Sequence, residues 1–136
     1  MDANVFVSAW IRPAGPPGQI LKLFIKEKAF ELILSNEILE EIRRSIYYPK
    51  VRKHIQATNH EIELGLASLE LLADSVEAQL PEPVVLQDPD DDKYLAAAIE
   101  GCAEYVVSGD DHLLQLGEYE GIKIVTPRAF WELLKA

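Results

Sequence analysis

Short blocks of apolar residues alternate with longer amphipathic segments along the chain. In the amphipathic segments the apolar residues recur at intervals of three and four, which is the spacing of one helical face. The pattern predicts helices around residues 20–25, from 36 to about 49, from 59 to about 73, from 92 to about 100, from 110 to 116 and from 127 onward. The short apolar blocks predict strands at residues 3–9 (the end of a strand), 30–34, 75–78, 105–107 and 122–125.

Polar residues and glycines mark the ends of these helices. Ser35 is placed to cap the helix that follows it, and Thr58 with Glu61 fits the capping-box pattern. Gly101 is a C-terminal stop signal, and Thr126 followed by a first-turn proline starts the last helix. Loops are predicted where proline and glycine gather, over residues 12–18 and around Pro81, Pro83 and Pro89.

The order of the elements predicts the fold class. Strands alternate with helices, and the strands are short and apolar, as in α/β proteins whose parallel sheet is covered by helices on both faces. We therefore expect a three-layer α/β/α architecture with a short, mainly parallel central sheet. The 136 residues fit a single domain over 1–136, without an internal repeat or a linker.

Composition narrows the class of protein further. With 49% hydrophobic and 26% charged residues, the chain is neither a disordered acidic tail nor a low-complexity polymer. No apolar run reaches the roughly 18 residues of a membrane span, and the N-terminus lacks the pattern of a signal peptide. The single Cys102, expected to be a small buried residue, excludes an internal disulfide and a cysteine-rich zinc site. A cytoplasmic protein without membrane contact is the expectation.

The net charge makes the placement of the acidic residues important. The 23 Asp and Glu against 13 Lys and Arg give −10, whereas passive nucleic-acid binders usually present a basic surface. The acids gather at 88–92, 110–111 and 40–41, and Asp2 stands alone. The helix from Asp92 climbs about 14 Å and the next strand returns about 17 Å. Asp110 is therefore expected back at the end of the domain where Asp92 lies, at the carboxyl edge of a parallel sheet.

Converging carboxylates repel one another unless a cation lies between them. An all-oxygen ligand set without cysteine suits Mg²⁺ or Mn²⁺, which activates water and neutralises charge on a phosphodiester. Each acidic segment also has a purely structural interpretation. Asp91–Asp92 and Asp110–Asp111 are suited to cap helices, and Glu41 alone is typical of a solvated helix face. We expect Asp90 and Asp91 to be solvated residues at a helix start.

Four segments of the chain form a recognisable set. They are Asp2-Ala-Asn-Val-Phe-Val-Ser-Ala9, Ser35-Asn-Glu-Ile-Leu-Glu-Glu-Ile42, Asp88-Pro-Asp-Asp-Asp-Lys-Tyr-Leu-Ala-Ala-Ala98 and Val106-Val-Ser-Gly-Asp110. Together they resemble the PIN-domain family, in particular the ribonuclease toxins of toxin–antitoxin pairs called VapC-like. The last strand and helix, from Ile122 to Phe130, also fit. Each motif is weak alone, but their order and the spacing of Asp92 and Asp110 are fairly specific, and the resemblance covers nearly the whole chain.

The resemblance implies a PIN fold, one or two Mg²⁺ or Mn²⁺ ions and cleavage of single-stranded RNA to 5′-phosphate and 3′-hydroxyl ends. It also implies an antitoxin partner and a homodimer. The matching acidic set, both catalytic and metal-binding, is Asp2, Glu41, Asp92 and Asp110, with Asn4 and Ser108 orienting it by hydrogen bonds. Asp92 and Asp110 are the first candidates for ligation.

Three positions depart from the family pattern. Asp2 follows Met1 directly, so the first strand is expected to be truncated. Ala3 replaces the usual threonine. His112 stands where a further aspartate often follows, and we expect an exposed helix histidine there.

One basic segment directly follows Glu41. Residues 42–54 contain no acid, and their cations are Arg43, Arg44, Lys50, Arg52 and Lys53. The first hypothesis is that these cations contact the RNA backbone and that Tyr47 and Tyr48 stack on bases. The alternative is a solvated helix face with the tyrosines packed inward.

Two other functions stay open from the sequence. One is a DNA or flap-type nuclease, which would share the metal dependence and differ in substrate. The other is a catalytically silent protein-binding module, favoured if the helix over Ile62 to Leu72 leaves an apolar groove exposed. A divalent cation that raises the melting temperature, with the effect lost in Asp92→Asn, would argue against the silent module.

Overall fold

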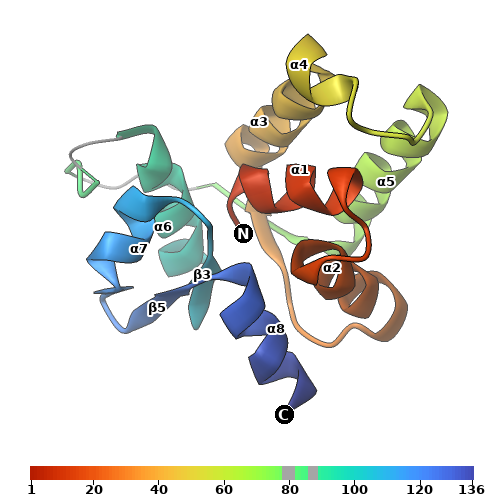
Figure 1. Ribbon diagram of the computed structural model, residues 1–136. Helices are drawn as coiled ribbons and strands as arrows, with labels where there is room; N and C mark the ends of the chain where they lie inside the picture. Colours follow the sequence, from red (N-terminus) through yellow and green to blue (C-terminus); the bar gives the residue numbers. More distant parts are fainter. Residues whose placement is uncertain (78–81, 86–88) are drawn as a thin grey trace.

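The computed structural model describes residues 1–77, 82–85 and 89–136 (Figure 1). Two of the predicted features, Pro81 and Asp88, lie outside the described residues. The elements in chain order are α1 (Ala3–Ile11), α2 (Pro16–Glu27), β1 (Ile33–Ser35), α3 (Asn36–Tyr47), α4 (Pro49–Arg52), α5 (Asn59–Leu72), β2 (Asp74–Val76), a 3₁₀ turn (Pro89–Asp91), α6 (Asp92–Glu100), β3 (Tyr105–Val107), α7 (Asp111–Leu116), β4 (Glu118–Tyr119), β5 (Ile122–Val125) and α8 (Pro127–Lys135).

The helix ends predicted at Ser35, Thr58, Gly101 and Thr126 are confirmed, whereas Asp91 at the start of α6 makes no side-chain capping hydrogen bond. The Ser35 side chain accepts from the Ile38 amide at 3.2 Å at the start of α3. Thr58 and Glu61 form a reciprocal capping box on α5, and Thr126 caps α8 ahead of its first-turn proline. Gly101 is the C-cap of α6. These ends follow local chemistry, because each cap supplies an acceptor or a turn that the helix end lacks.

The prediction of a strand over residues 3–9 is wrong, because this segment is the helix α1. Its alternating valines suggested a strand, but Asp2 accepts from the Asn4 amide at 3.1 Å and caps a helix instead. Its buried residues, Ala3, Val5, Phe6, Val7 and Ala9, do not keep to a narrow stripe. A short helix that is packed around most of its circumference loses the amphipathic period on which the prediction relied.

Other boundaries moved by a few residues. The strand predicted at 30–34 is β1 at Ile33–Ser35, and the one predicted at 75–78 is β2 at Asp74–Val76, with Ala78 outside the described residues. Helix α2 begins at Pro16, inside the predicted loop, since proline at the first helical positions costs no hydrogen bond. Gly18 is required there, because a Cβ atom would lie 2.0 Å from the carbonyl oxygen of Pro13.

The strands are short and mostly parallel, as the sequence predicts, and the described residues form two small sheets. Strands β1 and β2 pair in parallel, with Ile33 opposite Asp74. The other sheet has the order β3-β5-β4, with β3 and β5 parallel and β4 antiparallel to β5. The antiparallel pair is the edge hairpin around Gly121, whose φ of 84° lies in the left-handed region that favours glycine. The α/β class is confirmed.

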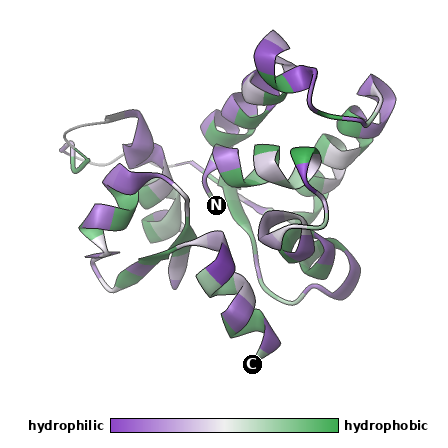
Figure 2. Ribbon diagram, viewed as in Figure 1, coloured by the Kyte–Doolittle hydropathy of each residue, from purple (hydrophilic) through white to green (hydrophobic). Residues whose placement is uncertain are grey.

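The core lies on both faces of β3, which places the strand in a middle layer. Val106 belongs to the larger hydrophobic cluster, with Leu95 of α6 and Leu113 of α7. Val107 belongs to a second cluster with Val5, Ile20 and Phe130. Because successive strand side chains point to opposite faces, β3 is covered from both sides. Figure 2 shows apolar residues on the inward sides of the helices and hydrophilic residues outward.

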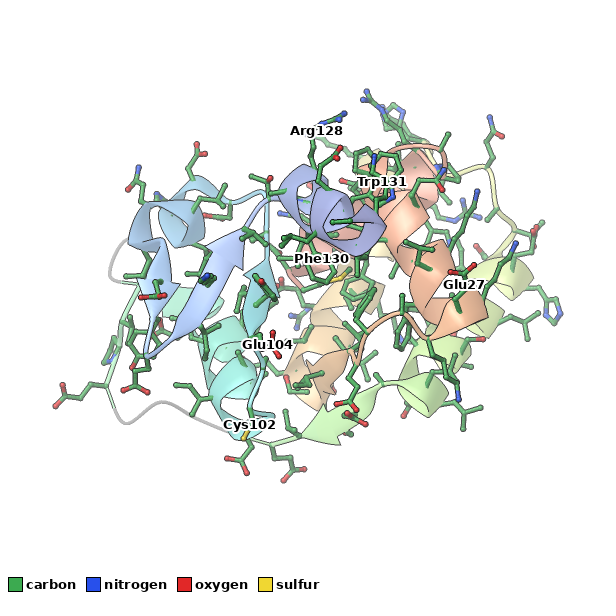
Figure 3. The ribbon with its side chains drawn as sticks, turned by 90° about the horizontal axis from the view of Figure 1, so that it is seen from below. Glu27, Cys102, Glu104, Arg128, Phe130 and Trp131 are labelled. Atoms are coloured by element: carbon green, nitrogen blue, oxygen red, sulfur yellow. The ribbon has the colours of Figure 1, made fainter. Side chains whose placement is uncertain are left out.

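Helix α8 closes the second cluster with aromatic contacts. The Phe130 ring lies 5.1 Å from Phe30 in an edge-on arrangement and 5.8 Å from Tyr105, between ring centroids (Figure 3). Cys102, at the end of α6, is exposed, so the expectation that it is buried is wrong. Its φ of 54° places it in the turn that ends the helix, where the chain runs over the surface.

The N-terminal residues lie at the centre of the molecule, between the two sheets (Figure 1). The Asp2 amide donates to the carbonyl of Val107 at 2.9 Å, so the chain enters beside β3. A cavity of about 540 Å³ separates the sheets, and its lining includes Met1, Ile33, Tyr105 and Phe130. None of the helices in the described ranges is long and apolar enough to cross a membrane.

Candidate functional site

The end of β3 brings Asp2, Ser108 and Asp110 together. The Ser108 hydroxyl donates to Asp2 Oδ2 at 2.7 Å and accepts from the Asp110 amide at 2.9 Å. Ser108 is fully buried, and Asp2 is 3% exposed. The serine that we expected to orient the acids therefore joins the carboxylate of Asp2 to the main chain of Asp110.

Both aspartates also cap helices. Asp2 Oδ1 accepts from the Asn4 amide, and Asp110 Oδ1 accepts from the His112 amide at 2.7 Å, at the starts of α1 and α7. Each helix N-terminus thus faces one of the two carboxylates, and the positive end of its dipole stabilises that charge. The capping and site interpretations of these residues hold together. Asn4 acts here through its main chain, since its side chain is exposed.

His112 lies beside this pair. Its Nδ1 atom is 3.8 Å from Asp110 Oδ1, and its side chain is 42% exposed, as expected for a histidine on the surface of α7. The amino group of Met1 is buried and interacts with the charge of Asp2. Burial lowers the pKa of this ammonium from 8.0 to about 6, while the neighbouring Asp2 charge acts to raise it.

Glu41 of α3 is bound by two side chains from the first turn of α6. Lys93 Nζ forms an ion pair with Glu41 Oε2, and the Tyr94 hydroxyl donates to Glu41 Oε1. The same hydroxyl accepts from the Ala3 amide at 3.1 Å. Tyr94 therefore connects Glu41 to the start of α1, where Asp2 lies.

The electrostatics of Tyr94 reflect the acids around it. Burial raises its pKa first, the Asp2 charge raises it further, and the hydrogen bond to Glu41 adds to both. The hydroxyl consequently remains protonated throughout the physiological range and acts as a permanent donor to Glu41. This donor and Lys93 hold Glu41 in a fixed orientation.

Asp92 binds main-chain amides of the preceding segment and none of the other predicted acids. Its Oδ1 accepts from the Val85 amide at 2.8 Å, and its Oδ2 from the Val84 amide at 3.1 Å, so the carboxylate fastens the segment at 82–85 to the start of α6. The neighbouring Asp91 is only 7% exposed, so the prediction that it is solvated is wrong, whereas Asp90 is exposed as expected. The chain turns through Pro89–Asp91 before α6 and buries Asp91 there.

The donor chemistry of this site fits a divalent cation. Asp2, Glu41 and Asp110 offer carboxylate oxygens, which are the ligands that hard cations take in proteins. In the described part of the chain, however, no three acidic, histidine or cysteine side chains converge closely enough to hold an ion. Protein donors hold the carboxylates instead: the Ser108 hydroxyl, the helix amides, Tyr94 and Lys93. Asp2, Asp110 and Glu41 are the residues that would hold a cation, with Asp92 at the adjoining helix start.

The basic segment is partly engaged within the protein. Arg43 pairs with Glu63 of α5, and the Tyr47 hydroxyl donates to the same carboxylate. These two hydrogen bonds hold the pKa of Glu63 below its ordinary value. Arg52 donates to the carbonyls of Ile55 and Ala57, both at 2.9 Å, and so stabilises the turn into α5.

The remaining candidates of this segment face solvent. Arg44, Lys50 and Lys53 are exposed, as is Tyr48, which is 54% exposed. Tyr47 instead lies partly buried against α5. The structure thus divides the five predicted RNA-binding cations into two that hold α5 in place and three that face outward.

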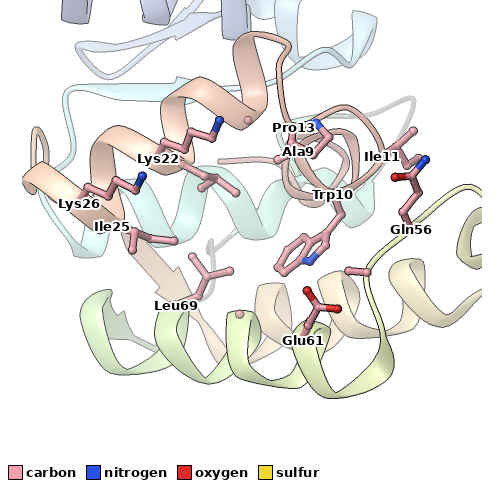
Figure 4. Close-up of a pocket in the computed structure, with 14 residues that line it drawn as sticks. Ala9, Trp10, Ile11, Pro13, Lys22, Ile25, Lys26, Gln56, Glu61 and Leu69 are labelled. Atoms are coloured by element: carbon pink, nitrogen blue, oxygen red, sulfur yellow. The ribbon is translucent and has the colours of Figure 1, made fainter.

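A separate groove lies between α1, α2 and α5 (Figure 4). It has a volume of about 510 Å³, and Trp10, Ile25 and Leu69 line it. The Trp10 ring lies close over Gly65, where a Cβ atom would meet it at 2.6 Å. Helix α5 turns Ile62, Leu66 and Leu69 inward, while Leu64 is 56% exposed.

Sequence reasoning missed Lys93 and Tyr94 as site residues. A lysine in the first turn of a helix is a signal, because the helix dipole disfavours a cation there unless a carboxylate faces it. Tyr94 gave no comparable signal. Its position two residues after Asp92 matches an ordinary buried helix residue, and only the packing of α6 against α3 reveals its hydroxyl contacts.

Comparison with known proteins agrees with this arrangement. The sequence profile of the PIN domain matches residues 1–112. An uncharacterized protein of Methanocaldococcus jannaschii is 33% identical over 144 aligned residues, which cover 97% of this chain and 88% of that protein. No solved structure is a significant match to the chain. On the match of the PIN profile to most of its length, the chain belongs to the PIN-domain family.

Proposed function

We propose that this protein is a metal-dependent endoribonuclease that hydrolyses phosphodiester bonds in single-stranded RNA. PIN domains are generally nucleases, which places the chain among phosphodiester hydrolases at the level of the family. The observation that carries the finer proposal is the bridge from the Asp2 carboxylate through Ser108 to the main chain of Asp110, with Tyr94 connecting the start of α1 to Glu41. Carboxylates gathered at the end of a parallel strand suit a cation and a phosphate together.

The chain's own residues have separable roles in this proposal. Asp2 and Asp110 present oxygens at the end of β3, Ser108 fixes their relative position, and Tyr94 orients Glu41. A divalent cation bound there, Mg²⁺ or Mn²⁺, would lower the pKa of the attacking water and neutralise charge on the phosphate. Asp92 positions the start of α6, and a modest rearrangement of the 82–85 segment would free its carboxylate for the same cation.

Cleavage of a labelled single-stranded RNA tests the proposal directly. Wild type is compared in Mg²⁺, Mn²⁺ and EDTA with Asp92→Asn and Asp110→Asn, and with Asp111→Asn as a matched control on an exposed carboxylate next to the site. Metal-dependent cleavage that is lost in the first two variants and kept in the third supports the proposal. Equal activity in EDTA overturns the metal dependence, and preference for a DNA duplex or flap substrate overturns the RNA assignment.

The exposed cations offer a surface for the RNA backbone. Arg44, Lys50 and Lys53 are the proposed direct contacts, and Arg43 and Arg52 support the surface through their bonds to α5 and its preceding turn. Charge reversal at Arg44 should weaken RNA binding and reduce its salt dependence. Charge reversal at Arg43 should in addition lower stability, because it places two carboxylates together. RNA affinity that is unchanged in both variants contradicts the assignment.

The cellular role we propose is that of the toxin in a type II toxin–antitoxin pair, acting as a homodimer. This rests on the resemblance of the four acidic segments to VapC-like proteins. The test is growth arrest on expression of wild type, absent for Asp110→Asn, together with relief by a protein encoded next to it. Expression without effect on growth, despite nuclease activity in solution, overturns the toxin role and leaves the nuclease.

A second candidate function is a protein-binding module without catalysis. The groove between α1, α2 and α5 favours it, because Ile25, which lines this apolar cavity, remains 44% exposed. The engaged state of Glu41 and Asp92 also agrees with it. An intact fold that shows neither cleavage nor stabilisation by Mn²⁺ would support this module over the nuclease.

A further inference from the structure

Lys93 is the one lysine drawn into the acidic site among the described residues, and its position is unusual. Its side chain is 8% exposed, its Nζ atom pairs with Glu41 Oε2, and it donates to the carbonyl of Asp90 at 2.9 Å. The Nζ atom also lies 5.1 Å from the centre of the Tyr94 ring. By contrast, the Lys135–Glu132 pair on α8 is about half exposed.

The surroundings explain why a lysine is held at an unfavourable place. The first turn of a helix repels a cation through its dipole, and a buried ammonium loses hydration. Lys93 is nonetheless there, next to Asp91 and Asp92 and against Glu41. The charge of Glu41 is what makes this position favourable, because Tyr94 supplies only a neutral donor to the other oxygen.

We propose that Lys93 is an internal counter-cation that neutralises Glu41 when no metal is bound, and that a divalent cation must displace it from Glu41. This rests on the proposed metal-dependent function. Lys93 is thus a positioning residue: it does not touch the RNA, and it sets how tightly the site takes its metal.

The physical basis is competition between two cations for one carboxylate. Both oxygens of Glu41 are engaged, one by Lys93 and the other by Tyr94. A divalent ion that uses Glu41 would stand beside the ammonium, and like charges within a few ångströms repel strongly where water is excluded. Moving the flexible lysine stem outward relieves that repulsion, at the cost of the ion pair. Metal affinity is therefore lower than the carboxylates alone would give.

The test compares metal affinity in wild type and four variants, measured by calorimetric titration with Mn²⁺ alone. Lys93→Met removes the charge and keeps the stem, and Lys93→Gln keeps a hydrogen-bond donor in case the methionine variant folds poorly. Lys135→Met is the matched control, because it also removes one charge and one lysine–glutamate pair, but on α8. Lys93→Arg keeps the charge.

The expected result is that the dissociation constant for Mn²⁺ falls about tenfold or more in Lys93→Met and Lys93→Gln. Lys135→Met and Lys93→Arg should stay near wild type. In EDTA, Lys93→Met should melt below wild type because Glu41 is left uncompensated, and saturating Mn²⁺ should raise its melting temperature more than that of wild type. A merely structural lysine would lower stability without tightening metal binding.

Two results overturn the proposal and can be told apart. If wild type binds Mn²⁺ and the uncharged Lys93 variants bind it equally or more weakly, Lys93 does not compete with the metal, and the nuclease proposal stands. If neither wild type nor any of the four variants binds Mn²⁺, the metal dependence fails and this inference fails with it.

Discussion

The site contains two carboxylate groups that the protein neutralises in different ways. At the end of β3, neutral donors hold both carboxylates: the Ser108 hydroxyl and the Asn4 amide donate to Asp2, and the His112 amide donates to Asp110. On α3, Glu41 is held by the charged Lys93 as well as by Tyr94. No lysine pairs with the first group in the described residues, whereas the charge of Glu41 is already balanced by Lys93.

This difference indicates which group attracts a cation first. Neutral donors orient a carboxylate without cancelling its field, whereas an ion pair with a lysine cancels most of it. The helix starts at α1 and α7 make the Asp2–Asp110 pair favourable without a counter-ion. We therefore expect the β3 end to supply most of the attraction for a metal and Glu41 to contribute after Lys93 moves.

The largest expected effect is the loss of Mn²⁺ affinity when a carboxylate of the first group is removed. Asp110→Asn should weaken Mn²⁺ binding by about 100-fold, because it removes a charge that no lysine balances, an effect of about 2.7 kcal/mol. Glu41→Gln should weaken Mn²⁺ binding by about tenfold or less, because the metal no longer has to displace Lys93 from its ion pair. Calorimetric titration measures both, with Asp111→Asn as the control. Equal losses in the two variants would mean that the two carboxylate groups do not differ.

Removing the serine loosens the first group without changing its charge. Ser108→Ala deletes a fully buried hydroxyl that serves both Asp2 and the Asp110 amide, so we expect the free energy of unfolding to fall by about 2 kcal/mol. Urea denaturation measures it. The exposed Ser8→Ala on α1 should stay within about 0.5 kcal/mol of wild type. A loss no greater than that of the control would remove Ser108 from the network.

The N-terminal ammonium makes the stability of this region depend on pH. For a chain that begins at Met1, the amine titrates at about 6 when folded and near 8.0 when unfolded. Between these values the unfolded chain binds more protons, so the free energy of unfolding should rise with pH, by about 2 kcal/mol in all. Urea denaturation from pH 5.5 to 8.5 tests this, and an Nα-acetylated chain should lack this part of the rise.

The smallest expected effect concerns the residue that joins the two groups. Tyr94→Phe leaves the Ala3 amide and one Glu41 oxygen without the hydroxyl, which should cost about 1 kcal/mol. Tyr48→Phe, at an exposed tyrosine, should cost almost nothing. Thermal unfolding of the two variants measures the difference. If Tyr94→Phe is as stable as Tyr48→Phe, the two groups are not coupled through this hydroxyl.

Local chemistry made much of the fold predictable. The caps at Ser35, Thr58 and Thr126 depend on neighbours within three residues, so the sequence alone places those helix starts. Strands β3 and β5 were predictable because short apolar blocks between capped helices are too short for a further helix and too apolar for an exposed loop. Helix α1 was not predictable in this way, since it is packed around most of its circumference and its apolar pattern has no helical period.

The candidate site, like the fold, has a part that the sequence predicts and a part that depends on packing. Its acidic residues could be named from residue type, spacing and family resemblance, and the Ser108 position came with them. The sequence could not predict two sets of contacts: the ion pair of Lys93 with Glu41, and the hydrogen bonds of Asp92 with the Val84 and Val85 amides. Only packing brings these partners together. The position of an acidic residue in the sequence does not determine which donor will bind its carboxylate in the folded protein.

The sequence by itself determined the capped helix ends, the apolar blocks of the main strands, the order of the elements after α1 and the set of acids available to a cation. These follow from short-range capping, side-chain periodicity and residue chemistry, which act within a few positions. The tertiary structure alone decided that the strands form two sheets around a buried N-terminus, and which acids are neutralised by a lysine, a hydroxyl or an amide. Those outcomes depend on burial and on contacts between distant segments, for which no local pattern exists.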